Sequence, residues 1–164
     1  MKNQTHFASR IGVRAVVAGM MTTSALLLLI MFLVAALGLW NFRLRELPFL
    51  SATFWMASSM ALTVSIFAGG LMAASGSRSS TISDGIINAL VVCSGCYLFF
   101  SFVFVYFASN ALMLILESVT PDFFLKIFMV CLTGFIAAVL GGIGGVRYEQ
   151  KIERQEKNIY ASSY

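Results

Sequence analysis

The chain has 164 residues, of which 59% are hydrophobic and 11% are charged, and its mean hydropathy is +0.88. A typical soluble domain carries about 25% charged residues, and a domain of this size leaves much of its surface in water. The composition therefore excludes a soluble enzyme, a nucleic-acid-binding domain, a disulfide-rich secreted module and a disordered linker. It predicts a protein that resides in the lipid bilayer.

Four long stretches contain no Asp, Glu, Lys or Arg, namely residues 15–40, 51–77, 85–116 and 127–146. A helix needs about 20 apolar residues to cross a hydrocarbon core of about 30 Å. Lipid leaves backbone polar groups unsatisfied unless a segment is helical or part of a closed barrel, and barrel strands are shorter and alternate in polarity. The predicted fold class is all-α, an integral membrane four-helix bundle made of two hairpins.

The predicted transmembrane domain covers residues 1–147, and residues 148–164 form a charged cytoplasmic tail with a short helical extension. The spans are expected at about residues 15–40, 51–74, 86–108 and 123–146. The first span follows basic residues, as in a signal peptide, but its apolar run is longer than the roughly 7–15 residues of a cleavable segment. We expect it to stay as an anchor.

Small residues recur every four positions in the second span and in the fourth. The second span carries one such stripe, Ala57, Ala61, Ser65, Gly69 and Ala73. The fourth span carries two, Gly134/Ala138/Gly142 and Ala137/Gly141/Gly145. Small residues let helices approach closely in lipid, where the hydrophobic effect does not drive their association. The stripes predict either packing within one bundle or a face that contacts another subunit.

The third span begins with polar residues, for which two roles are open. Ser83 to Gly85 offers an N-cap, and Asp84 and Asn88 share a helix face at the expected cytoplasmic mouth, just after Arg78. Ionisable residues near a membrane span are candidates for function, although Asp84 is explained by capping alone. The uncharged stretch is too long for one upright span, so we expect either a strongly tilted helix or, as the favoured alternative, a bend near Ser109 and Asn110.

The fourth span is expected to open at Pro121, with Asp122 near the positive end of the helix dipole and paired with Lys126 four residues later. Beyond Val146 the charged run RYEQKIERQEKN carries a thin apolar stripe of Tyr148, Ile152 and Ile159. This run is either a solvated continuation of the helix, or a docking helix or self-associating coil.

The distribution of basic residues predicts the orientation, because cytoplasmic segments are rich in Lys and Arg. On one side lie Lys2, Arg10, Arg14, Arg78, Arg147, Lys151, Arg154 and Lys157. On the other side lie Arg43, Arg45 and Lys126. Both termini are therefore expected in the cytoplasm. The net charge of +4 is explained by this bias and requires no nucleic-acid partner.

The cysteines Cys93 and Cys96 form a CxxC motif inside the third span, and Cys131 lies in the fourth. A redox CxxC needs a stabilised thiolate, which an apolar span disfavours. We interpret the three cysteines as packing residues, with a membrane dithiol enzyme and a metal site as alternatives. No catalytic residue, cofactor or metal is predicted.

The segments SIFAGGLMAA at 65–74 and DGIINALV at 84–91, with Ser77 and Arg78 between them, resemble a pattern in small bacterial inner-membrane proteins of unknown function. Those proteins also close with a glycine-rich fourth helix, like AAVLGGIGGVR at 137–147. This chain departs from them at Ala89 and Cys93, near which they carry Gly and Trp. The resemblance implies four helices in a bacterial inner membrane and no known activity.

The sequence thus predicts a non-enzymatic structural or accessory protein of the inner membrane. It would self-associate or pack against other membrane-protein subunits through its small-residue faces. No charged residue lies at mid-span, which disfavours ion-coupled transport. The alternative is a small oligomeric channel or transporter with a pore lined by Ser58, Ser65, Asn88 and Ser94.

Overall fold

The computed structural model describes residues 12–36, 52–77, 81–109 and 121–162, which form four α-helices and no strand. The helices are α2 (Val13–Ala36), α3 (Ala52–Gly76), α4 (Ile82–Ser109) and α6 (Pro121–Ser162). Each contains a segment that is long and apolar enough to cross a membrane. Within the described residues, the prediction of an all-helical protein with four such segments is confirmed.

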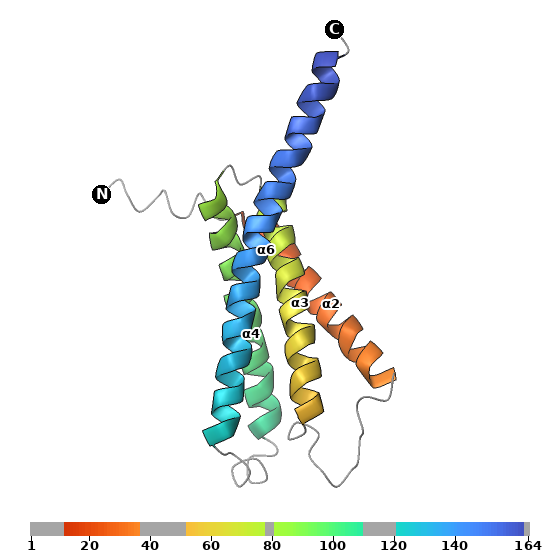
Figure 1. Ribbon diagram of the computed structural model, residues 1–164. Helices are drawn as coiled ribbons and strands as arrows, with labels where there is room; N and C mark the ends of the chain where they lie inside the picture. Colours follow the sequence, from red (N-terminus) through yellow and green to blue (C-terminus); the bar gives the residue numbers. More distant parts are fainter. Residues whose placement is uncertain (1–11, 37–51, 78–80, 110–120, 163–164) are drawn as a thin grey trace, which may run out of the picture.

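Helices α3 and α4 each contact the other three helices, whereas α2 and α6 share no contact among the described residues. The most extensive contact is that of α3 with α6, which lie side by side (Figure 1). The start of α2 lies beside the end of α3, since a Cβ on Gly76 would stand 3.5 Å from the Cβ of Ala15. The start of α4 lies beside α6, where a Cβ on Gly85 would collide with Val146. The start of α2 and the α6 residues around Val146 therefore lie at one end of the bundle.

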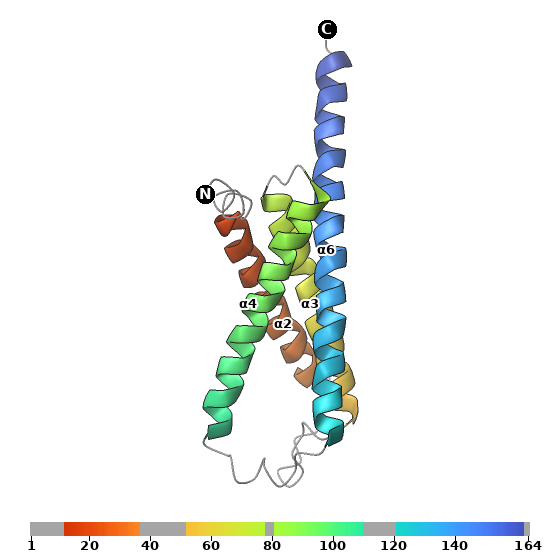
Figure 2. The same cartoon turned by 90° about the vertical axis from the view of Figure 1, so that its left-hand side faces the viewer.

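The core occupies this end and the middle of the bundle. Its buried residues fall between 15 and 23, 61 and 74, 85 and 96, and 134 and 146. Beyond them α2 diverges from α3 (Figure 1) and α4 diverges from α6 (Figure 2). Large apolar side chains there are exposed, among them Phe32 (73%), Phe102 (74%) and Phe128 (60%). The bundle is close-packed at one end and splayed at the other.

The N-cap predicted at the start of the third helix is wrong by two residues. The helix begins at Ile82, and the hydroxyl of Thr81 accepts a hydrogen bond from the backbone N–H of Asp84 at 3.3 Å. The same hydroxyl donates to the Asp84 carboxylate at 2.7 Å. Thr81 is therefore the N-cap residue of α4, its hydroxyl is bonded to both the backbone and the side chain of Asp84, and Ser83 lies within the first turn.

Helix α6 begins at Pro121, as predicted, and the Lys126 ammonium lies 3.2 Å from the Asp122 carboxylate. It then runs without a break to Ser162, well past the other helices (Figures 1 and 2). We call residues 147–162 the rod. Helix α4 is described to Ser109, so the predicted bend at Asn110 lies outside the described residues.

Candidate functional site

Helices α2 and α3 cross with their backbones in contact at two glycines. A Cβ on Gly69 would lie 2.6 Å from the Gly19 carbonyl oxygen and would also collide with the Thr23 hydroxyl. A Cβ on Gly19 would in turn lie 2.6 Å from the Gly69 carbonyl oxygen. The Thr23 hydroxyl is fully buried and donates to the Gly19 carbonyl at 2.9 Å. Only glycine fits at either position, because Cβ atoms do not approach other atoms this closely.

Helices α3 and α6 meet along one of the two small-residue stripes of α6. A Cβ on Gly145 would lie 2.5 Å from the Leu71 carbonyl oxygen and 2.7 Å from the Ala74 Cβ. A Cβ on Gly141 would collide with the Phe67 carbonyl oxygen. The stripe formed by Ala137, Gly141 and Gly145 is buried, and its two glycines bring the α6 backbone onto α3.

The other stripe of α6 faces α4 along much of its length. A Cβ on Gly142 would lie 2.8 Å from the Gly85 carbonyl oxygen and 3.1 Å from the Ala89 Cβ. A Cβ on Gly134, two turns earlier, would collide with the Tyr97 hydroxyl. Ala138 between them is fully buried, and its carbonyl also faces Gly70 of α3. Helix α6 therefore uses its two stripes on two different neighbours.

The remaining predicted packing residues lie on α3. Ala61 and Ala73 are buried, Ser65 is fully buried and donates to the Ala61 carbonyl at 2.7 Å, and Ala57 is half-buried. The close contacts of the glycine stripes are all made with helices of the same chain. Packing within the bundle accounts for these contacts without a second subunit.

Sequence reasoning missed a polar contact between α4 and α6. The Tyr97 hydroxyl donates to the Cys131 carbonyl at 3.0 Å, with the Val130 carbonyl at 3.4 Å, and its ring lies 5.5 Å from that of Phe135. A tyrosine in an apolar span needs a hydrogen-bond partner for its hydroxyl. This requirement could have indicated a contact between Tyr97 and a neighbouring helix. The third span contains many aromatic residues, however, and the sequence does not distinguish Tyr97 from them.

The predicted polar mouth is described at two of its three residues. Asp84 is half-buried and bonded to Thr81, Asn88 is fully buried in α4, and Arg78 lies outside the described residues. The proposed pore residues are not gathered on one surface, because Ser65 and Asn88 are fully buried whereas Ser94 is exposed.

The two cysteines of the CxxC motif enter different parts of the core. Cys93 packs in a cluster with Ile66, Ala89, Ala137 and Ala138. Cys96 packs in another with Val16, Ala73 and Val92. Cys131 is half-buried, and all three thiols are free. The described part of the chain contains no group of three His, Cys, Asp or Glu residues that could hold a metal ion.

The rod continues the α6 face that contacts α3 inside the bundle. Tyr148 and Ile152 follow Gly141 and Gly145 at spacings of three and four residues, which keeps them on one helix face. They are 59% and 39% exposed. A notch of about 470 Å³ lies beside them, lined by Ser75, Tyr148, Glu149, Ile152, Glu153 and Glu156. The charged residues of this notch are all acidic.

Comparison with models of protein families, with curated proteins and with solved structures finds no match to this chain. The resemblance indicated by the sequence motifs therefore stays a prediction.

Proposed function

We propose that this chain is a non-enzymatic accessory protein of a bacterial inner membrane, with both termini in the cytoplasm. It associates with other membrane-protein subunits, either copies of itself or different proteins, and the rod is its contact surface. The observation that carries the proposal is the unbroken passage of α6 from the packed bundle into an exposed, charged helix.

A helix of the rod's length is marginal on its own in water, because nucleation is unfavourable. Here the transmembrane part of α6 nucleates it, and the glycine contacts with α3 and α4 fix its direction and rotation. The bundle thus presents the rod as a rigid arm, which suits a protein that positions a partner at the membrane surface.

The small-residue faces offer little to a partner, since their glycines lie against other helices of the same chain. We therefore place the contact on the rod face formed by Tyr148 and Ile152, with the acidic notch beside it. A partner segment with apolar and basic side chains complements this surface, through burial of the two side chains and pairing with the glutamates.

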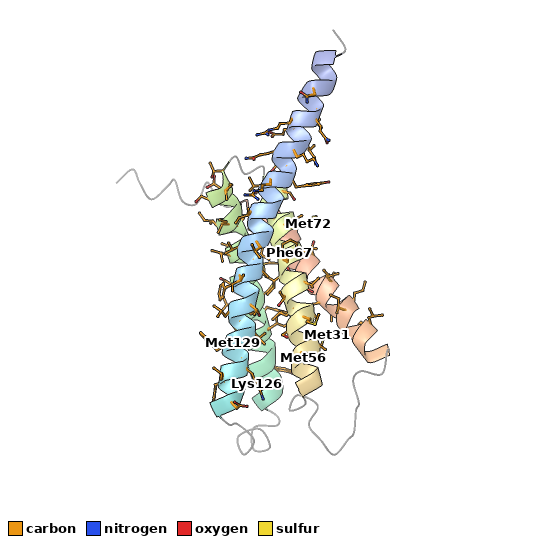
Figure 3. All side chains as sticks on the ribbon, in the orientation of Figure 1. Met31, Met56, Phe67, Met72, Lys126 and Met129 are labelled. Carbon is orange, nitrogen blue, oxygen red and sulfur yellow. The ribbon has the colours of Figure 1, made fainter. Side chains whose placement is uncertain are left out.

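The expected orientation agrees with the charges at the two ends of the bundle. Among the described basic residues, Arg14, Arg147, Lys151 and Arg154 lie at the end that carries the rod, and Lys126 lies at the other (Figure 3). Positive charge is typical of the cytoplasmic side, which supports a cytoplasmic rod.

Site-specific photo-crosslinking in native membranes tests the proposal. A photoreactive residue at Tyr148 or Ile152 should give one protein adduct of defined mass, and that mass distinguishes a second copy from a different protein. The matched control is Arg154, which lies about 200° from Ile152 around the helix and should give no such adduct. Equal adducts at all three positions, or none at any, would contradict the proposal.

A companion variant tests the charge complementarity. Glu153→Lys together with Glu156→Lys should abolish the adduct at Ile152, whereas Lys151→Glu on another face should preserve it. An adduct that survives the double reversal would show that the acidic notch does not select the partner.

A further inference from the structure

We propose that the groove between α3 and α6, at the end of the bundle opposite the rod, holds one phospholipid whose headgroup carries both a phosphate and a primary ammonium. One acyl chain lies along the groove, and the headgroup lies on Asp122 and Lys126 at its mouth. This inference does not depend on the proposed function.

The groove has a volume of about 650 Å³ and is lined on both sides by apolar side chains. Its apolar walls are formed by Met56, Met60 and Val64 of α3 and by Leu125, Met129 and Val130 of α6. Figure 3 labels Met56, Met129 and Lys126 in this part of the molecule, away from the rod. Methionine side chains are unbranched and adapt to irregular shapes, which suits a flexible hydrocarbon chain.

Three hydroxyls also line the groove, and each donates a hydrogen bond to its own helix. Thr63 donates to the Ser59 carbonyl at 2.7 Å, Ser59 to the Met56 carbonyl at 3.0 Å, and Thr133 to the Val130 carbonyl at 2.9 Å. Their donors are therefore used within the protein, and the groove does not require a polar occupant.

The depth of the groove matches one leaflet of the membrane. From Asp122 to Thr133 the helix rises about 16 Å, roughly half of the 30 Å hydrocarbon core. The groove ends at Val64 and Thr133, beside the next contact of the two helices, where a Cβ on Gly134 would lie 3.1 Å from the Ile66 side chain. A transmembrane helix would need a groove that extends across the whole thickness of the membrane. The acyl chain of a lipid needs a groove that extends across one leaflet only.

Charge complementarity selects the headgroup. Lys126 and Asp122 lie 3.2 Å apart at the mouth, with side chains 47% and 70% exposed. A phosphate can bind the ammonium of Lys126 while the lipid ammonium binds the Asp122 carboxylate, so that both charges are paired. An anionic lipid without an ammonium would share Lys126 with Asp122 and supply no second cation for the Asp122 carboxylate.

The test uses the full chain in phosphatidylcholine nanodiscs that contain a small fraction of phosphatidylethanolamine with a photoreactive acyl chain. Labelled peptides should come from residues 56–64 and 125–133, and unlabelled phosphatidylethanolamine should compete better than phosphatidylglycerol. The substitution Met60→Trp fills the groove and should reduce labelling of residues 125–133 about tenfold, as expected for loss of a specific site. Met21→Trp is the matched control, because Met21 and Met60 are 70% and 68% exposed.

The headgroup contact has its own readout. Asp122→Asn should remove the preference for phosphatidylethanolamine over phosphatidylglycerol while labelling of the groove persists. Lys126→Gln leaves the Asp122 carboxylate in place and should keep that preference. Equal labelling of α2 residues 28–33 would overturn the proposal by showing bulk lipid only. Equal competition by phosphatidylglycerol, an unchanged signal in Met60→Trp, or a protein adduct formed from Met60 in native membranes would overturn it as well.

Discussion

The hydroxyl of Tyr97 in α4 donates a 3.0 Å hydrogen bond to the backbone carbonyl of Cys131 in α6, directly beside Gly134. The residue at 134 must be glycine for this contact, because a Cβ there would collide with the hydroxyl. A polar side chain of one span and a small residue of another are thus parts of a single helix contact. It joins α4 to α6 at the edge of the buried core, next to Cys96, the last buried residue among those described in α4.

Removing this hydroxyl should destabilise the bundle modestly. We expect Tyr97→Phe to lower the free energy of unfolding by about 0.5–1.5 kcal/mol, the usual net contribution of a hydrogen bond. The measurement is unfolding in mixed micelles of mild detergent and dodecyl sulfate. Tyr148→Phe on the exposed rod is the control and should leave the value unchanged, and equal stability of the two variants would remove the assigned role of the hydrogen bond.

Two adjacent glycines should respond in opposite ways to the same substitution. Gly145→Ala places a methyl group 2.5 Å from the Leu71 carbonyl oxygen, and overpacking of this kind costs about 1–3 kcal/mol. Gly144→Ala meets nothing within 4 Å and should be neutral or stabilise the helix by up to about 1 kcal/mol. Thermal unfolding in detergent measures both, and equal losses would show that α6 does not contact α3 as described.

The start of α4 offers a second matched pair. Thr81→Ala removes the hydroxyl that accepts from the Asp84 N–H, which should cost about 0.5–2 kcal/mol. Ser83→Ala should cost little, because Ser83 is exposed within the first turn. Amide hydrogen exchange of residues 82–86 should accelerate in the first variant. Faster exchange in the Ser83 variant alone would place the cap at Ser83 after all.

A designed disulfide tests the arrangement of the first hairpin. The three natural cysteines, Cys93, Cys96 and Cys131, are first replaced by alanine. In that background, Ala15→Cys combined with Gly76→Cys should readily form a disulfide on oxidation. A Cβ on Gly76 would lie 3.5 Å from that of Ala15, within the range of natural disulfides. The pair Leu33→Cys with Gly76→Cys should stay reduced, since Leu33 lies near the far end of α2. Oxidation of the second pair and not the first would reverse the direction of α2.

Much of the fold could be predicted from the pattern of charge along the sequence. Uncharged runs that are long enough, as helices, to cross the hydrocarbon core predict transmembrane helices. Pro121, followed by Asp122 and Lys126, correctly predicted the start of α6. The cap of α4 was misplaced because Ser83 and Thr81 are both good N-cap residues. Only the pairing of Thr81 with Asp84 three positions later distinguishes them.

The partners of the small-residue stripes could not be predicted from the sequence. A stripe such as Gly141 and Gly145 shows that a helix can be approached closely, but it does not show by which neighbour. Gly69 meets α2, Gly145 meets α3 and Gly142 meets α4, although all three lie in similar patterns. The choice depends on helix rotation and crossing, which the whole bundle sets together. The groove at Met60 and Met129 results from the same geometry, since it opens where α3 and α6 separate.

The most direct test of the rigid arm is a pair of alanine insertions between Arg147 and Tyr148, each combined with a photoreactive residue in place of Ile152. Two alanines rotate the rod face by about 200° relative to the bundle, whereas four rotate it by about 40° and raise it by about 6 Å. We expect the partner adduct to be lost with two alanines and largely retained with four. Equal adduct yields from the two insertions would contradict a partner surface held in fixed rotation by the bundle.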